Sequence, residues 1–137
     1  MNSNKNVIFC AAGVLKKEQF CLIAKRPEGK PFAGLWEFPG GKIHFPETPE
    51  EALERELSEE LGINIEGHKL QKITEISYEY PDFHLSMPTF LCQHWENEPQ
   101  GLEGQLLRWV TIQELVNYDI LPASKEIIHL LHRFFQH

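Results

Sequence analysis

The chain has 137 residues, of which 42% are hydrophobic and 24% are charged, a composition typical of one globular domain spanning residues 1–137. A formal net charge of −7 disfavours binding to a nucleic-acid polymer. The first apolar run, Val7–Val14, is too short to cross a membrane, and the polar start lacks the basic residues of a signal peptide. Three cysteines without metal-binding spacing indicate reduced thiols in the cytoplasm.

Extended segments dominate the first third of the chain. The β-rich runs Val7–Leu15 and Phe20–Lys25 flank a short charged segment, which predicts a hairpin. The prolines and glycines of Pro27–Gly34 predict a loop. Leu35–Phe38 follows as a short predicted strand that stops at Pro39.

The strongest predicted helix begins at Thr48. This residue is a suitable N-cap, Pro49 suits the first helical position, and Glu51 completes a capping box. Gly62 is a typical C-terminal stop, so the helix is expected to run to about Leu61.

Three more strands and two more helices are predicted in the second half. Leu70–Tyr80 and His84–Trp95 are extended segments joined at a Pro-Asp turn, and Leu106–Val110 is the last strand. A second capping box, Thr111–Glu114, predicts a short helix, and Ser124 is expected to cap the terminal helix. That helix has an apolar stripe formed by Ile127, Ile128, Leu130, Leu131, Phe134 and Phe135. The fold class is therefore α+β, with a mixed sheet between helices.

An acidic cluster lies on the predicted helix. Glu56, Glu59 and Glu60 share an arc of about 100°, beside an apolar arc of leucines that faces the sheet. Like charges at these spacings destabilise a helix by a few tenths of a kcal/mol per pair, so a compensating cation is expected. Oxygen ligands of this kind suit Mg²⁺, with Mn²⁺ as a substitute. The cluster taken alone fits a solvated helix face equally well.

The residues around the cluster identify a family. Residues 41–63 match the Nudix pattern G-x5-E-x7-R-E-U-x-E-E-x-G-U at every specified position, where U is aliphatic. Such a match arises by chance on the order of once in a billion starting positions. The chain thus resembles the Nudix hydrolases, and four other segments resemble the MutT-like members: Leu35–Lys42, Tyr80–Asp82, Trp95–Pro99 and Glu103–Gln105.

This resemblance implies a Nudix α/β/α sandwich and a set of metal ligands. The implied ligands are the backbone carbonyl of Gly40 and the side chains of Glu56, Glu59, Glu60 and Glu103. Without the resemblance, position 103 is an ordinary loop acid. The adjacent glycine residues at 40 and 41 suit a backbone conformation that lets a carbonyl face the metal.

Two further residues of the motif are predicted to support this site. Arg55 lies one turn before Glu59 and can hold the rotamer of that carboxylate, although a surface ion pair of small value is the alternative. Glu47 precedes the helix, where the helix dipole favours an acid, and in the family it supports the metal site.

The reaction implied by the resemblance is attack of water on phosphorus in a nucleoside diphosphate linkage. For MutT-like members the substrate is a nucleoside triphosphate, chiefly 8-oxo-dGTP, and the products are the monophosphate and pyrophosphate, which is nucleotide-pool sanitation. We favour Glu56 as the general base, with Glu60 and Glu103 as alternatives.

Recognition of the base is where the chain departs from the MutT-like pattern. Ser124 stands where these members have asparagine after a Pro-Ala dipeptide, and a hydroxyl cannot reproduce the paired donor and acceptor of an amide. Phe83 stands where they have arginine after the Pro-Asp turn. The predicted substrate-binding residues are Arg26, Phe38, Gly41, Lys42 and Ser124.

Alternative functions stay open at this point. Pyrimidine pyrophosphatases acting on CTP or 5-methyl-dCTP share the Ala33–Phe38 segment, while other Nudix hydrolases act on ADP-ribose, diadenosine polyphosphates, sugar nucleotides or capped RNA. A non-catalytic nucleotide-sensing Nudix module would have lost box glutamates, and none is missing. No Ser-His-Asp arrangement or P-loop is evident, and the histidines show no metal spacing. The oligomeric state is open, with a monomer favoured.

Overall fold

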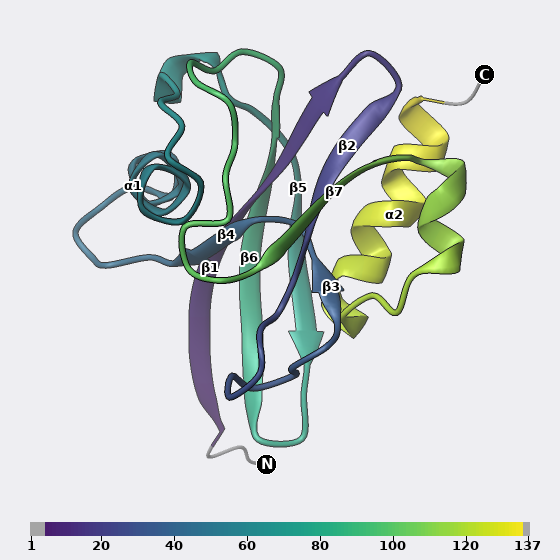
Figure 1. Cartoon of the computed structure of the whole chain (residues 1–137). Helices are drawn as coiled ribbons and strands as arrows, with labels where there is room; N and C mark the ends of the chain where they lie inside the picture. The colour runs from purple at the N-terminus through teal and green to yellow at the C-terminus, as the bar shows by residue number, and fades with distance from the viewer. Residues whose placement is uncertain (1–4, 136–137) are drawn as a thin grey trace.

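The computed structural model describes residues 5–135, and its centre is a seven-stranded mixed sheet (Figure 1). Met1–Asn4 and Gln136–His137, which include most of the polar start and the end of the predicted terminal segment, lie outside the described residues. The elements in chain order are β1 (Asn6–Lys17), β2 (Phe20–Lys25), β3 (Trp36–Glu37), β4 (Gly40–Lys42), α1 (Pro49–Leu61), the 3₁₀ helix η1 (Gly67–Lys69), β5 (Gln71–Glu79), β6 (Phe83–Cys92), β7 (Leu106–Thr111), the 3₁₀ helix η2 (Gln113–Asn117) and α2 (Pro122–Phe134).

Strand β1 is the axis of the sheet. On one side it pairs in parallel with β6, which in turn pairs with β5 in antiparallel fashion. On the other side, its middle pairs with β4 and its end pairs with β2 in the predicted hairpin. Strand β2 then carries β3 and β7. The sheet therefore divides into two branches that share β1.

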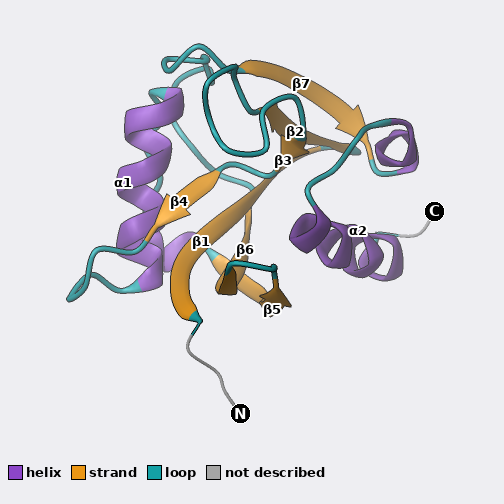
Figure 2. Cartoon of the chain, turned by 90° about the horizontal axis from the view of Figure 1, so that it is seen from below, coloured by secondary structure: helices purple, strands orange, loops and turns teal. Residues whose placement is uncertain are grey.

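The two long helices lie on opposite sides of the sheet (Figures 1 and 2). The leucines of α1 pack with Leu22 and Phe90 in one hydrophobic core. Ile127 and Leu131 of α2 pack with Val14 in a second core. These two cores define an α/β/α sandwich, as the sequence predicts.

Helix α1 forms where its capping signals predict. The Thr48 hydroxyl accepts a hydrogen bond from the Glu51 N–H at 3.1 Å, and the Glu51 carboxylate accepts one from the Thr48 N–H at 2.9 Å. At the other end, Gly62 has a φ of 71°, the left-handed conformation that glycine adopts without a steric penalty. The acids and leucines of the helix are thus placed in a fixed register relative to the sheet.

Several local predictions are wrong. The strand before Pro39 does stop there, but β4 was not predicted, and it forms because the two glycines after Pro39 pair with β1. Ser124 does not cap the terminal helix, since α2 begins at Pro122 and its N-cap is Leu121. The second capping box does form, but the helix that follows it is a 3₁₀ turn. Phe134 of the predicted apolar stripe is 58% exposed.

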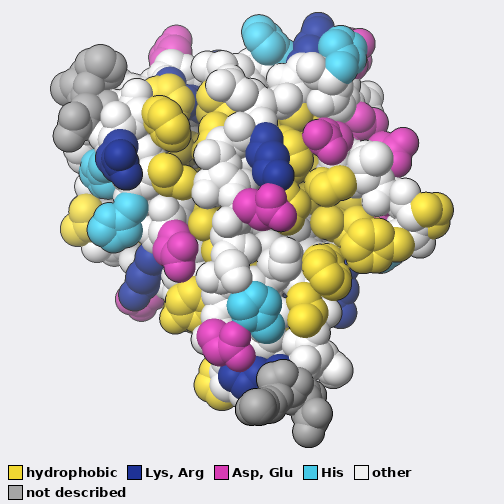
Figure 3. Space-filling model, turned by 180° about the vertical axis from the view of Figure 1, so that it is seen from behind, with side chains coloured by type: hydrophobic (Ala, Val, Ile, Leu, Met, Phe, Trp, Pro, Cys, Tyr) yellow, Lys and Arg dark blue, Asp and Glu magenta, His cyan; other side chains and the backbone are white. Residues whose placement is uncertain are grey.

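The face opposite to that in Figure 1 has hydrophobic side chains interspersed with charged and histidine side chains (Figure 3). Across residues 5–135, no helix combines the length and apolar character needed to span a membrane.

Candidate active site

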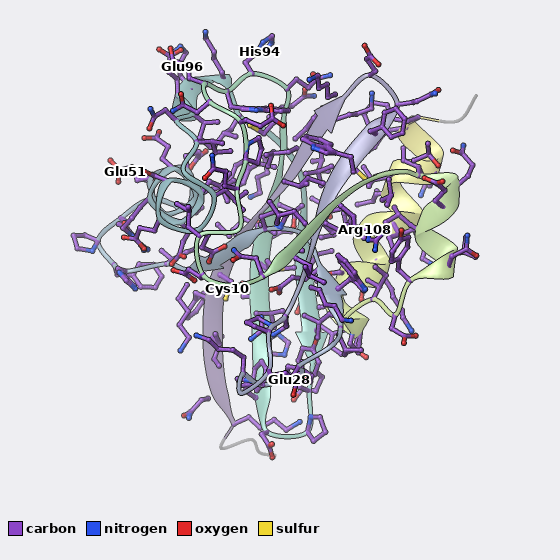
Figure 4. The ribbon with its side chains drawn as sticks, in the orientation of Figure 1. Cys10, Glu28, Glu51, His94, Glu96 and Arg108 are labelled. Carbon is purple, nitrogen blue, oxygen red and sulfur yellow. The ribbon has the colours of Figure 1, made fainter. Side chains whose placement is uncertain are left out.

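A cleft of about 530 Å³ runs across the molecule from the acidic face of α1 to the first turn of α2. Its floor is formed by β1 and β6, and its opposite side by β3 and the loop of residues 26–32. Cys10 of β1, labelled in Figure 4, lies in this floor. The cleft brings together nine of the predicted site residues: Arg26, Phe38, Gly40, Gly41, Lys42, Glu56, Glu60, Glu103 and Ser124. Three others lie outside its lining: Glu47, Arg55 and Glu59.

At the acidic end, Glu56 and Glu60 of α1 meet Glu103 from the loop before β7. The loop is held against the helix because the Leu102 N–H and the Gln105 side-chain amide both donate to the Glu60 carbonyl, at 3.0 and 3.3 Å. Burial raises the pKa of the Glu60 carboxyl above its ordinary value, and its hydrogen bond with Glu56 and the charges of Glu56 and Glu103 add to this rise. The carboxylates at this end are therefore close enough to one another to disfavour the ionised form of Glu60.

Arg55 organises the acids beside this end. Its Nε donates to Glu47 at 2.6 Å and its Nη1 donates to Glu56 at 2.9 Å. The predicted contact with Glu59 is longer, at 3.5 Å, and the Glu59 side chain is 56% exposed. The hydrogen bond from Arg55 is the largest cause that lowers the pKa of Glu47, to about 2. Arg55 thus orients Glu47 and Glu56 more closely than the predicted partner Glu59.

The glycines of β4 allow the strand to approach its neighbours. A Cβ atom at Gly41 would overlap the carboxylate of Glu56, and one at Gly40 would overlap the carbonyl oxygen of Ala11. Side chains at these two positions would therefore displace either the Glu56 carboxylate or the central strand.

The donor set at the acidic end suits a hard divalent cation. Glu56, Glu60 and Glu103 offer only oxygen atoms, and the nearest guanidinium, that of Arg55, is engaged with Glu47 and Glu56. Within residues 5–135, no three His, Cys, Asp or Glu side chains are already arranged as a metal site. Glu56, Glu60 and Glu103 line the same end of the cleft without being close enough together to form a metal site, so a bound cation would have to draw them together.

An ion pair in the middle of the cleft was not predicted as part of the site. The Arg26 Nη1 donates to both carboxylate oxygens of Glu37, at 3.1 and 3.0 Å. Burial raises the pKa of Glu37, while the charge of Arg26 and its hydrogen bond act in the opposite direction. One feature of the sequence could have revealed Glu37. It lies between two aromatic residues, Trp36 and Phe38, that are buried, and alternation along a strand places its side chain on the opposite side from theirs.

The end of the cleft opposite the acids is aromatic. The rings of Tyr80 and Phe83 are stacked, with centroids 4.9 Å apart, and Phe32 contacts Tyr80 at 5.3 Å. Phe38 is only 3% exposed, so it belongs to the core and also borders the cleft. Ser124 is 4% exposed beside these rings. This surface is suited to stacking against a flat aromatic ring such as a nucleobase.

A polar network outside the cleft joins β5 and β6. Ser77 Oγ lies 2.8 Å from His84 Nε2, and Glu79 lies 2.6 Å from His84 Nδ1. The sequence gives no sign of this serine–histidine–acid order, because the register of the two strands creates it. The three side chains lie outside the lining of the cleft, and Glu79 also pairs with Lys5. We therefore assign the network to the sheet surface.

Comparison with known proteins agrees with the fold and the site. The family model described as NUDIX domain matches residues 10–130. The chain is 39% identical to an 8-oxo-dGTP diphosphatase of Escherichia coli (strain K12) over 124 residues, which cover 90% of this chain and 95% of the relative. It is 40% identical to one of Haemophilus influenzae over 129 residues, or 93% of each protein. A CTP pyrophosphohydrolase of Escherichia coli is 33% identical over 128 residues, or 86% of each.

A solved structure, from a study of MutT of Aliivibrio salmonicida and Vibrio cholerae, superposes with a TM-score of 0.81. It is 32% identical in sequence, with 95% of this chain and 100% of that chain covered. The chain therefore belongs to the Nudix family and is a hydrolase that acts on phosphoric anhydrides. Within that family it is similar to MutT, which confirms the resemblance noted in the sequence.

Proposed function

We propose that this protein is a MutT-like nucleoside triphosphate pyrophosphohydrolase. It hydrolyses an oxidised nucleotide such as 8-oxo-dGTP to the monophosphate and pyrophosphate, and it thereby removes damaged nucleotides from the pool. The observation that carries this proposal is the polarity of the cleft, which is acidic at α1 and aromatic near α2. A nucleoside triphosphate bound with divalent cations is complementary to this cleft, because it carries the cations at its phosphate end and an aromatic base at its other end. The 8-oxo-dGTP diphosphatases among its relatives support the choice of base.

The metal ligands that we propose are Glu56, Glu59, Glu60, Glu103 and the carbonyl of Gly40. Mg²⁺, with Mn²⁺ as a substitute, would neutralise phosphate charge and lower the pKa of a bound water when present. Glu59 lies outside the lining of the cleft and 3.5 Å from the Arg55 guanidinium, so its side chain would have to turn toward the other acids to act as a ligand.

The chain's own residues supply orientation and proton transfer. The Arg55 Nη1 donates to the Glu56 carboxylate at 2.9 Å and orients it, and a general base must be held within reach of the water that it deprotonates. Glu56 takes a proton as the water oxygen bonds to phosphorus and the bond to the bridging oxygen breaks. Arg55 and Glu47 are positioning residues for this step. Lys42 and Arg26 lie along the cleft, where their charges can meet phosphate oxygens.

A pyrimidine substrate is the second candidate, and two observations favour it. Ser124 offers a single hydroxyl at the aromatic end, and the CTP pyrophosphohydrolase of Escherichia coli is similar to most of this chain. The small hydroxyl leaves the edge of the base less constrained than a side-chain amide would.

The experiment is a panel of nucleotides with Mg²⁺, scored for pyrophosphate against orthophosphate release. It contains 8-oxo-dGTP, dGTP, CTP, 5-methyl-dCTP and ADP-ribose, and it includes Glu56→Gln as an inactive control. We expect the highest kcat/KM and pyrophosphate release with 8-oxo-dGTP. Selective turnover of CTP would replace the proposed substrate, and no turnover of any nucleotide would favour a sensor.

We place the reaction in the cytoplasm. The three cysteines, Cys10, Cys21 and Cys92, are all free thiols, and the last two are buried. Free thiols are typical of a reducing compartment, where the nucleotide pool also lies.

A further inference from the structure

Glu37 lies in the middle of the cleft. Its strand, β3, pairs with β2 so that Glu37 faces Ala24, and both residues line the cleft. The same cleft is lined by Glu60 and by Tyr80. Glu60 belongs to the acidic end and Tyr80 to the aromatic end, so Glu37 lies between the two.

Glu37 has unused capacity to accept hydrogen bonds. A single nitrogen of Arg26, Nη1, serves both carboxylate oxygens, while Arg26 Nε donates to the Pro31 carbonyl at 2.6 Å. Each carboxylate oxygen can accept two hydrogen bonds, so lone pairs are left over. The Glu37 side chain is 29% exposed, which makes it accessible from the cleft. A carboxylate paired with arginine accepts and does not donate, so the group that meets it must be a hydroxyl or an N–H.

The chemistry of a nucleotide determines which group that is. In a nucleoside 5′-triphosphate the sugar lies between the phosphates and the base. If the phosphates lie at the acidic end and the base lies against Tyr80 and Phe83, the sugar falls beside Glu37. We propose that the Glu37 carboxylate accepts a hydrogen bond from the 3′-hydroxyl of the sugar, which makes Glu37 a specificity residue for that hydroxyl. This inference rests on the proposed function.

A substrate that lacks the hydroxyl is then rejected for a physical reason. Binding covers Glu37 and removes water from its carboxylate, and a 2′,3′-dideoxy sugar returns no donor in exchange. A hydrogen bond to a charged group is worth a factor of about 10 to 100 in binding. Arg26 holds the carboxylate in place, so Glu37 cannot turn away to recover its hydration.

The test compares kcat/KM for dGTP and dCTP with that for their 2′,3′-dideoxy counterparts. For whichever base is hydrolysed faster, we expect the wild-type protein to prefer the 3′-hydroxyl by about tenfold or more. In Glu37→Met, which has no acceptor oxygen, this ratio should fall to near one. Glu37→Gln has an amide oxygen that can accept, so it should restore part of the preference. The matched control is Glu28→Met, an exposed acid of the neighbouring loop, labelled in Figure 4, that does not line the cleft; it should keep the wild-type ratio.

Each outcome decides the inference. An unchanged ratio in Glu37→Met would overturn it, as would a change in the preference between dGTP and dCTP with no change in the 3′-hydroxyl ratio. A wild-type protein that hydrolyses these nucleotides without any dideoxy penalty would refute the sugar contact alone. A wild-type protein that hydrolyses none of the nucleotide panel would refute the proposed function and this inference with it. If circular dichroism shows that Glu37→Met does not fold, Glu37→Gln provides the test. A 3′-hydroxyl ratio below the wild-type value supports the inference, and an unchanged ratio contradicts it.

Discussion

At the scale of single residues, Arg55 fixes the arrangement of the carboxylates at the acidic end, because its one guanidinium binds both Glu47 and Glu56. Groups that orient a ligating side chain typically affect activity by about 10- to 100-fold. We therefore expect Arg55→Gln to lower kcat by about 10- to 100-fold at saturating Mg²⁺. The measurement is steady-state hydrolysis of the best nucleotide of the panel.

The matched controls for Arg55 are Glu47→Gln and the double variant. Because Arg55 and Glu47 act as one unit through the 2.6 Å contact, the double variant should be no slower than Arg55→Gln. Losses that simply multiply would show that the two residues act independently.

The buried carboxyl of Glu60 should make the metal-free protein sensitive to pH. Its pKa is raised above the ordinary 4.5 mainly by burial, so the folded protein keeps a proton that the unfolded chain releases. The contribution of Glu60 to stability is therefore fully present below pH 4.5 and is lost as the pH rises through the raised folded pKa. We expect the melting temperature in EDTA to fall as the pH rises through the folded pKa of Glu60.

Glu60→Gln is the control for this prediction, because an amide does not titrate. This variant should show a smaller decline with pH, and it should melt above the wild type in EDTA at alkaline pH. Mg²⁺ should raise the melting temperature of the wild type. An identical pH profile for wild type and variant would assign the decline to other groups.

Within helix α1, the sequence correctly placed Glu56 and Glu60 on the side that lines the cleft, but Glu59 of the same predicted arc lies outside that lining. Glu56 and Glu60 were predicted to face the same way because helical geometry fixes their angles. Glu37 was missed because its place in the cleft depends on Arg26, which lies just after β2 in a different part of the chain. Base recognition was left open for the same reason, since Phe83 and Ser124 become neighbours of the cleft only through the packing of β6 and α2.

At the scale of elements, the predicted bounds agree best with the observed ones where the local sequence contains strong capping or turn signals. The bounds of α1 were predicted to the residue, because a capping box and a terminal glycine specify both ends. Strand β4 was missed because glycine has little intrinsic preference for strands, and only its pairing with β1 defines it. The start of α2 was placed too late because Pro122, and not Ser124, begins the helix.

The close approach of β4 to α1 can be tested with Gly41→Ala. The added methyl group would overlap the Glu56 carboxylate, which is the mobile end of a side chain. We therefore expect a loss of kcat of at least about tenfold, comparable to the removal of an orienting group. The melting temperature should change little, because the carboxylate can move away without disturbing the core.

A large drop in the melting temperature of Gly41→Ala would show that the backbone, and not the acid, absorbs the overlap. Thr48→Ala is the matched comparison, because it should lower stability by about 1 kcal/mol through the lost cap while leaving kcat close to that of the wild type.

At the scale of the whole molecule, two separate cores hold the sandwich together. Leu57 is fully buried in the core under α1, and Ile127 is fully buried in the core under α2. Replacing either with alanine should reduce the free energy of unfolding by about 2–5 kcal/mol. Because the side chains belong to different cores, the double variant should show the sum of the two losses to within about 0.5 kcal/mol. Urea denaturation measures all three values, and a marked departure from the sum would mean that the sheet couples the cores.

Helix α1 carries both the leucines that attach it to the sheet and the acids of the site. Each residue advances an α-helix by about 100°, so one inserted or deleted residue between Leu53 and Glu60 would turn the acids out of the cleft. An inserted alanine would have this effect without changing the charge of the protein. Variants that descend from this sequence should therefore keep the length of this segment fixed. A survey of tolerated insertions along the chain would measure this directly.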